Sequence, residues 1–138
     1  SSNGANAGAI SIEFDGNFEG NPERGNFYKP EKYGRHTLSQ AQIVAARTLI
    51  TTVNGMLPSI KRIFAHRQFG VSSKTGKPNR PLCPGHNIWT EIGEWAKNEF
   101  GLSDGGPGWV FTLNGKQRGL PIPDDWRGIP TDFFAGEV

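Results

Sequence analysis

His66 and Cys83 are the two residues of this chain whose side chains are best suited to bind a metal ion. A polar segment, residues 67–82, lies between them. Imidazole and thiolate groups are ligands that Zn²⁺ prefers, but a protein zinc site uses at least three such groups. Each residue also has an ordinary alternative, because a lone cysteine is usually a small buried apolar residue and a histidine at a strand end is usually satisfied by a hydrogen bond.

The residues that follow Cys83, PGHNIW, predict the start of a helix. Proline suits the first helical turn, where its missing N–H costs nothing, so Pro84 places Cys83 at or just before the N-cap. The free amides and the positive end of a helix favour the thiolate over the thiol at that position. Since Zn²⁺ binds the thiolate, this context favours a metal ligand, with a structural cysteine as the alternative.

Glu13 adds a carboxylate on a predicted strand. Residues 9–16 alternate apolar and polar side chains, and this period of two predicts a strand with one apolar face. Glu13 lies on the opposite face from Ile12 and Phe14. A carboxylate placed there is either solvated or a general base beside a metal-bound water.

Two helices and a second strand would position these groups. Residues 39–53 predict a helix with one apolar stripe, and Ser39 with Gln42 matches a capping box at its start. Residues 60–66 predict a short strand that ends in the candidate histidine. Residues 87–100 predict a second helix, with Gly101 as its stop.

The order strand, helix, strand, helix predicts a mixed α/β domain with a β-sheet flanked by helices. The pair Asn114-Gly115 predicts a hairpin turn, and the proline-rich residues 121–130 predict an extended strap. The C-terminal part is too aromatic for a free tail, so we expect it to pack on the body or to meet a partner. Its large aromatic residues are Trp109, Trp126, Phe133 and Phe134.

Composition limits the class of protein. A chain of 138 residues is one domain by its length, and its net charge of +2 without a basic cluster argues against a nucleic-acid partner. One cysteine cannot form an intrachain disulfide, and no apolar run approaches the ~18 residues of a membrane span. No cationic and apolar leader precedes the polar start at Ser1, so we expect a trimmed or processed chain.

Four segments, in this order, resemble the family of zinc-dependent N-acetylmuramoyl-L-alanine amidases and peptidoglycan recognition proteins, which includes phage endolysins. They are ISIEFDGNFEG, LSQAQIVAARTLI, IFAHRQ and CPGHNIWTEIGEW. The resemblance covers about residues 6–100. It implies that residues 1–102 are the C-terminal part of an amidase-like catalytic domain, and that residues 103–138 are an extension packed on the same domain.

The resemblance also implies Zn²⁺ as the cofactor and the residues that would use it. In this family two histidines and one cysteine or aspartate hold the metal; the strand histidine corresponds to His66 and the cysteine to Cys83. The strand glutamate, which orients or deprotonates the attacking water, corresponds to Glu13. The implied reaction is hydrolysis of the amide bond between N-acetylmuramic acid and L-alanine in peptidoglycan.

One zinc ligand of the family has no counterpart in this sequence. The family's other zinc histidine lies on a strand upstream of the segment that contains Glu13. We expect His36 to flank the first helix and His86 to meet solvent or substrate rather than the metal. The resemblance therefore implies that an upstream fragment or a second chain completes the site, and that zinc affinity and activity fall sharply without it.

Basic side chains are the predicted substrate contacts. Arg67 suits a stem-peptide carboxylate, because a guanidinium binds one through two parallel hydrogen bonds; a surface ion pair is the alternative. Family members usually carry a lysine or threonine two residues before the cysteine, where it stabilises the oxyanion, and this chain has Pro81 there. Lys77 and Arg80 belong to a long inserted loop at the expected rim of the substrate groove, and either one is a candidate to reach in or a solvated charge.

The leading hypothesis is a zinc amidase that cuts peptidoglycan, as an endolysin or another cell-wall hydrolase. The alternative is a peptidoglycan-binding recognition module that has lost the metal site. In both cases the expected partner is a muramyl peptide rather than a nucleic acid or a membrane. The expected place of action is extracellular, at the cell wall, reached by phage lysis or after processing.

Overall fold

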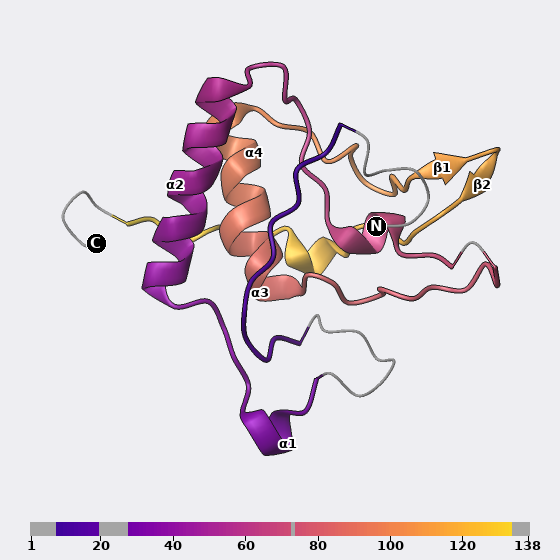
Figure 1. Cartoon of the computed structure of the whole chain (residues 1–138), viewed down its shortest axis with the longest axis horizontal. Helices are drawn as coiled ribbons and strands as arrows, with labels where there is room; N and C mark the ends of the chain where they lie inside the picture. The colour runs from indigo at the N-terminus through magenta and orange to yellow at the C-terminus, as the bar shows by residue number, and fades with distance from the viewer. Residues whose placement is uncertain (1–7, 20–27, 73, 134–138) are drawn as a thin grey trace.

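Two helical segments pack against each other at the centre of the structure, a computed structural model that describes residues 8–19, 28–72 and 74–133 (Figure 1). The first is helix α2 (Gln40–Met56). The second runs continuously through α3 (His86–Ile88), a π-helical stretch (Trp89–Glu94) and α4 (Trp95–Phe100). Buried apolar side chains from both segments form the larger hydrophobic core. Those from the helices are Ile43, Ala46, Ile50, Ile88, Ile92 and Ala96.

The predicted first helix is confirmed, together with its capping box. The Ser39 hydroxyl accepts a hydrogen bond from the Gln42 backbone N–H at 3.1 Å, and the Gln42 side-chain oxygen accepts one from the Ser39 N–H at 3.0 Å. Helix α2 ends at Met56, three residues beyond the predicted end. The Gln42 side chain also donates to the Asp15 carbonyl at 3.1 Å, so the start of α2 holds the segment that carries Glu13.

The predicted second helix and its glycine stop are also confirmed, since Gly101 adopts the left-handed conformation with φ 65°. The wide π-helical turns bring Glu94 under the Trp89 indole, which donates to the Glu94 carboxylate at 2.9 Å. Gly93 is required here, because a Cβ atom would lie 2.6 Å from the Trp89 ring. The expected place of Cys83, at or just before the N-cap, differs from the structure: the N-cap is Gly85, so Cys83 lies two residues before it.

Strands are few in the part of the chain that the structure describes. β1 (Thr112–Leu113) and β2 (Lys116–Gln117) form an antiparallel hairpin. Its turn is the predicted Asn114-Gly115 pair, with positive φ at both residues.

The strands predicted over residues 9–16 and 60–66 do not form in this structure. Each segment runs in an irregular conformation, and the second has one isolated bridge, from Arg62 to Ser103. A strand depends on a neighbour that pairs with its backbone groups, and neither segment has such a ladder here. Their apolar side chains still turn inward in part, because Phe14 and Ile63 pack against the larger core while Ile10 is 58% exposed.

The C-terminal segment packs on the helices through a second, smaller core. Trp126, in the short helix Asp124–Trp126, and Ile122 are buried together with Ala65 and Trp89. The Thr90 hydroxyl donates to the Trp126 carbonyl at 2.8 Å, which fixes the strap to the π-helical turns. Phe133 reaches the larger core, whereas Phe134 lies outside the described residues.

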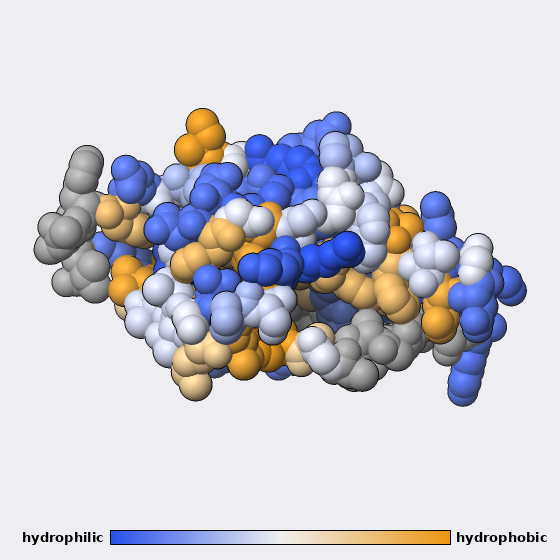
Figure 2. All heavy atoms as spheres, turned by 90° about the horizontal axis from the view of Figure 1, so that it is seen from above, coloured by the Kyte–Doolittle hydropathy of each residue, from blue (hydrophilic) through white to orange (hydrophobic). Residues whose placement is uncertain are grey.

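Two further short helices complete the described elements: α1 (Pro30–Tyr33) and a 3₁₀ turn (His66–Phe69). The surface shown in Figure 2 is largely hydrophilic, with apolar residues scattered among charged ones. Among the described helices, none has both the length and the apolar character needed to cross a membrane.

Candidate functional site

The structure brings His66 and Cys83 together. His66 opens the 3₁₀ turn, and its Nδ1 atom lies 3.7 Å from the Cys83 Sγ atom. The two segments are also joined through the backbone, because the Arg67 N–H donates to the Cys83 carbonyl at 2.9 Å. His66 is exposed and Cys83 is half-buried, so the pair is open to solvent on one side.

The spacing of the two side chains fits a shared zinc ion. With Zn–S near 2.3 Å and Zn–N near 2.0–2.1 Å, tetrahedral geometry separates the two ligand atoms by about 3.5 Å. The observed Nδ1–Sγ separation of 3.7 Å is close to that value. Within residues 8–19, 28–72 and 74–133, no third His, Cys, Asp or Glu joins them in a cluster that could hold a metal. The geometry therefore supplies two ligands that fit.

Partial desolvation shifts the pKa of both side chains. It lowers the pKa of the His66 imidazole, and the nearby positive charge of Arg80 lowers it further. It raises the pKa of the Cys83 thiol, and Arg80 opposes that effect only in part. The structure does not favour the expected helix-start thiolate, because the sulfur lies ahead of the N-cap and desolvation raises the pKa of the thiol.

Glu13 lies within electrostatic reach of this pair. Its negative charge acts to raise the pKa of both His66 and Cys83, although it is not the main influence on either. The side chain is exposed, so its carboxylate is accessible to a water molecule or a ligand. Its role as a general base stays a prediction.

Of the two loop cations predicted to contact substrate, Arg80 lies closer to the pair. Its charge acts on both candidate ligands, and its backbone N–H donates to the Gly70 carbonyl at 3.3 Å. Gly70 permits this approach, because a Cβ atom there would lie 2.5 Å from the Arg80 Cβ atom. Lys77 is exposed on a turn closed by a bridge between Val71 and Pro78.

Arg67 makes internal contacts. Its guanidinium lies over the Trp126 ring, 5.1 Å from the centroid, and donates a hydrogen bond to the Pro81 carbonyl. The side chain thus connects the 3₁₀ turn to the segment before Cys83 and to the C-terminal strap. Its predicted contact with a substrate carboxylate remains a prediction.

The other two histidines lie in different settings. His36 accepts a hydrogen bond from the Asn17 N–H at its Nδ1 atom, at 2.7 Å, and meets the Phe18 ring edge-on. This is the helix-flanking structural role expected from its position. His86 is exposed at the first position of α3.

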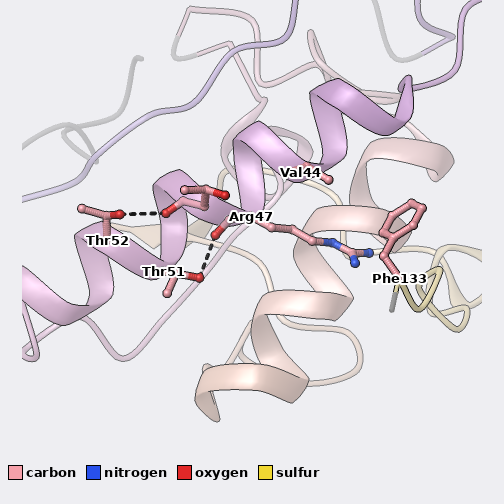
Figure 3. A pocket seen from close by; sticks show the side chains of 6 residues that line it. Val44, Arg47, Thr51, Thr52 and Phe133 are labelled. Carbon is pink, nitrogen blue, oxygen red and sulfur yellow. Dashed lines mark hydrogen bonds between the residues drawn. The ribbon is translucent and has the colours of Figure 1, made fainter. Parts of the chain in front are cut away.

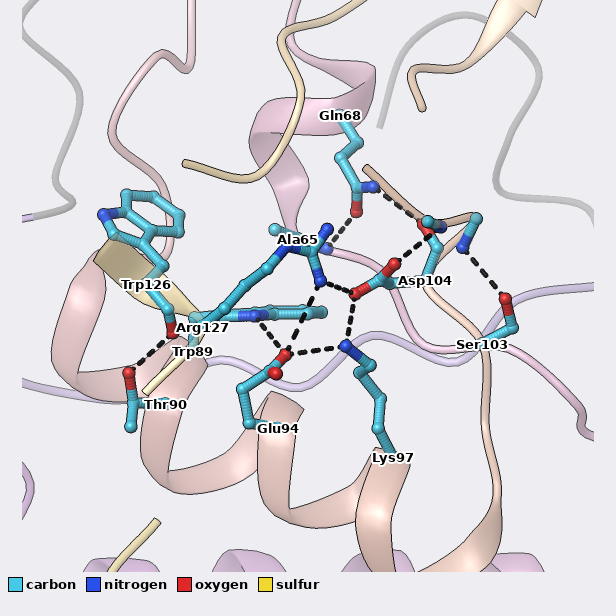
Figure 4. A network of polar contacts seen from close by, with 12 residues as sticks. Ala65, Gln68, Trp89, Thr90, Glu94, Lys97, Ser103, Asp104, Trp126 and Arg127 are labelled. Atoms are coloured by element: carbon cyan, nitrogen blue, oxygen red, sulfur yellow. Dashed lines mark hydrogen bonds and ion pairs between the residues drawn. The ribbon is translucent and has the colours of Figure 1, made fainter. Parts of the chain in front are cut away.

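Sequence reasoning missed Gln68, whose side chain is completely buried in the turn that carries His66. It accepts from the Ala65 N–H at 2.8 Å and donates to the Asp104 carbonyl at 3.0 Å (Figure 4). The second partner lies 36 residues along the chain, so no local pattern marks this glutamine.

A separate open pocket of about 310 Å³ lies on the face of α2 beside Phe133 (Figure 3). Three of its polar side chains already have partners. The Thr51 and Thr52 hydroxyls donate to helix carbonyls, and the Arg47 guanidinium bonds to the Glu91 carbonyl. The pocket contains none of the predicted site residues.

Part of the chain is similar to two curated proteins. It is 36% identical over 66 residues to peptidoglycan-recognition protein SC2 of Drosophila simulans, and equally to that of Drosophila melanogaster. The match covers 46% of this chain and 31% of each relative, so it spans about a third of their length. No family model matches the chain, and no solved structure matches it.

Proposed function

We propose that this chain binds peptidoglycan and contributes to zinc-dependent hydrolysis of the amide bond between N-acetylmuramic acid and L-alanine. One observation carries the proposal: the 3.7 Å separation of His66 Nδ1 and Cys83 Sγ fits two ligands of one ion. The printed name of the relatives, peptidoglycan-recognition protein, supports the substrate class. We propose that the chain acts outside the cell, at the wall.

In this proposal His66 and Cys83 hold the ion, with a third ligand from outside the described residues. A bound Zn²⁺ would supply Lewis-acid polarisation of the scissile carbonyl and a more acidic attacking water. The exposed Glu13 carboxylate accepts the proton of that water. The Arg80 guanidinium stabilises the negative charge that develops on the carbonyl oxygen, a role that Pro81, which has no side-chain donor, cannot perform.

A zinc titration of the whole chain tests the ligand assignment. We expect about one equivalent of Zn²⁺ to bind, with a lower affinity than at a site with three protein ligands, detected by competition with a weak chromogenic chelator. Cys83→Ser should abolish that binding, because it removes the sulfur ligand, while the far-UV circular dichroism stays unchanged. His86→Ala is the matched control, since it removes an exposed histidine three residues away. Wild-type zinc binding by Cys83→Ser would rule out the assignment.

Digestion of purified peptidoglycan tests the reaction. Mass spectrometry should find stem peptides with free L-alanine amino termini, in low yield because the third ligand lies outside the described residues, after incubation with the zinc-loaded chain, and none with Cys83→Ser. The second candidate function is recognition without cleavage, favoured by the name of the relatives and by the donor-free Pro81. Sedimentation of the chain with intact peptidoglycan and no release of amino termini would establish this alternative.

A further inference from the structure

The turn that carries His66 is held between two distant parts of the chain. On one side, the Arg67 N–H donates to the Cys83 carbonyl at 2.9 Å. On the other, the C-terminal segment supplies two backbone donors: the Leu120 N–H bonds to the Arg67 carbonyl at 2.8 Å, and the Phe111 N–H bonds to the Gln68 carbonyl at 3.0 Å. Both ends of the candidate metal pair are therefore fixed to one backbone framework.

Gln68 makes hydrogen bonds to several parts of this framework through both its backbone and its side chain. Its backbone N–H donates to the Ala65 carbonyl at 3.0 Å, and its side-chain oxygen accepts from the Ala65 N–H at 2.8 Å. These reciprocal bonds close the turn around His66, which follows Ala65 directly. The Gln68 side-chain amide then donates to the Asp104 carbonyl, so the turn is anchored to the start of the C-terminal segment.

The anchor at Asp104 is itself rigidly held. The Asp104 carboxylate accepts from Arg127 at 2.6 Å and pairs with Lys97 of α4 at 2.7 Å (Figure 4). Its side chain is 2% exposed. Gln68 thereby connects the 3₁₀ turn to the central helices as well as to the strap.

Gly119 shows how closely the C-terminal segment approaches the turn. A Cβ atom at this position would collide with the Gln68 carbonyl and would lie 2.7 Å from the Arg67 carbonyl oxygen. Only glycine permits this contact, so a methyl group at residue 119 would push this part of the C-terminal segment away from the turn.

From these contacts we infer that Gln68 is a positioning residue, which sets the direction of His66 toward Cys83, and that residues 104–120 act as a clamp on it. The metal-binding consequence rests on the proposed function. Outer-shell groups that orient ligands typically change metal affinity by about 10- to 100-fold when removed. The clamp lies beyond the segments that carry the family resemblance.

Two variants test the clamp from opposite sides: Gln68→Met, which keeps length and volume without hydrogen bonds, and Gly119→Ala. Ile50→Ala, a substitution in the larger core on α2 and outside the clamp, is the control for general loss of stability. Two readouts are compared at a temperature where all variants are folded. They are the zinc dissociation constant and, in metal-free protein, the nuclear Overhauser contacts between the His66 ring and the Cys83 β-protons.

We expect both clamp variants to weaken zinc binding by about 10- to 100-fold and to lose the His66–Cys83 contacts, and Ile50→Ala to retain both. Wild-type contacts and affinity in both clamp variants would overturn the inference while leaving the zinc site intact. If the wild-type chain binds no zinc, the proposed function fails, and the metal-free contacts alone decide whether Gln68 positions His66. If Ile50→Ala lost as much zinc affinity and as many His66–Cys83 contacts, the effect of Gln68 would be general stabilisation of the fold, and the positioning role would be ruled out.

Discussion

At the scale of single residues, His66 and Cys83 share surroundings that shift the pKa of both side chains. Burial disfavours the charged form of each, because it lowers the pKa of the imidazole and raises that of the thiol. A nucleophilic cysteine depends on the opposite arrangement, a thiolate beside an imidazolium. The pair is therefore better suited to hold a metal than to attack a substrate, and the metal must displace a proton from the sulfur.

Zinc binding should strengthen as pH rises through neutrality. Because the pKa of the Cys83 thiol lies above its usual value, most of the protein carries the S–H form at neutral pH, and each rise in pH removes part of that competition. The low pKa of His66 keeps its imidazole neutral over the same range. Chelator competition at a series of pH values, corrected for the chelator's own protonation, measures this trend. A dissociation constant that does not change with pH would contradict it.

The residue types at the site could be predicted from sequence, but their environment could not. Imidazole and thiol groups are identifiable as zinc ligands wherever they occur. Whether Cys83 ionises depends on burial by distant segments and on the true position of the N-cap, Gly85. The contact between Gln68 and Asp104 carries no local signal, since the two residues lie 36 positions apart in the sequence.

At the scale of elements, local sequence signals predicted the helices and the hairpin correctly. The two predicted strands did not form, because a strand depends on pairing with a distant segment. The capping box at Ser39, the stop at Gly101 and the Asn114-Gly115 turn are each decided within a few residues. The alternation of apolar and polar side chains in residues 9–16 indicates only which side chains could face a core. Whether a strand forms depends on a second segment that pairs with its backbone groups, and the sequence pattern does not identify that segment.

The cap of α2 offers a direct test of such a local signal. Ser39→Ala removes the acceptor of the Gln42 N–H and should lower the free energy of unfolding by about 1 kcal/mol. Urea unfolding followed by circular dichroism measures this loss. Ser59→Ala is the control, because Ser59 is exposed outside the helix, and it should stay within about 0.5 kcal/mol of the wild type. Equal stability of Ser39→Ala and the wild type would show that the cap contributes nothing.

At the scale of the whole molecule, a cluster of four charges joins the C-terminal segment to the central helices. Lys97 of α4 bridges Glu94 at 2.9 Å and Asp104 at 2.7 Å, and Arg127 of the strap pairs with Asp104 at 2.6 Å (Figure 4). Together with the smaller core around Trp126, these bonds make the strap part of the folded body. The same cluster holds the anchor of Gln68, so the stability of the molecule and the geometry of the candidate site share one set of contacts.

Asp104→Asn should change how the free energy of unfolding depends on pH, because it removes the carboxylate at the centre of this cluster. Burial alone would raise the pKa of Asp104, but hydrogen bonds from Arg127 and Lys97 outweigh it and hold the pKa below its usual value. A carboxyl group whose pKa is lower in the folded state than in the unfolded state stabilises the fold at pH values above its unfolded pKa. That stabilisation is lost as the pH falls through the folded pKa. At neutral pH the variant should therefore lose about 3 kcal/mol, the low end for a broken buried pair, because both cations retain some contact with water.

Urea unfolding between neutral pH and about pH 3 then separates this electrostatic account from a packing defect. As pH falls below the unfolded carboxyl pKa, the unfolded state takes up a proton that the folded state does not, so the advantage of the wild type over Asp104→Asn should narrow steadily toward pH 3. Asp124→Asn is the matched control, because that carboxylate is exposed on the strap, and its stability should follow the wild type at every pH. If the gap between the wild type and Asp104→Asn stays constant down to low pH, the variant has damaged packing and the charge cluster does not hold the strap in place.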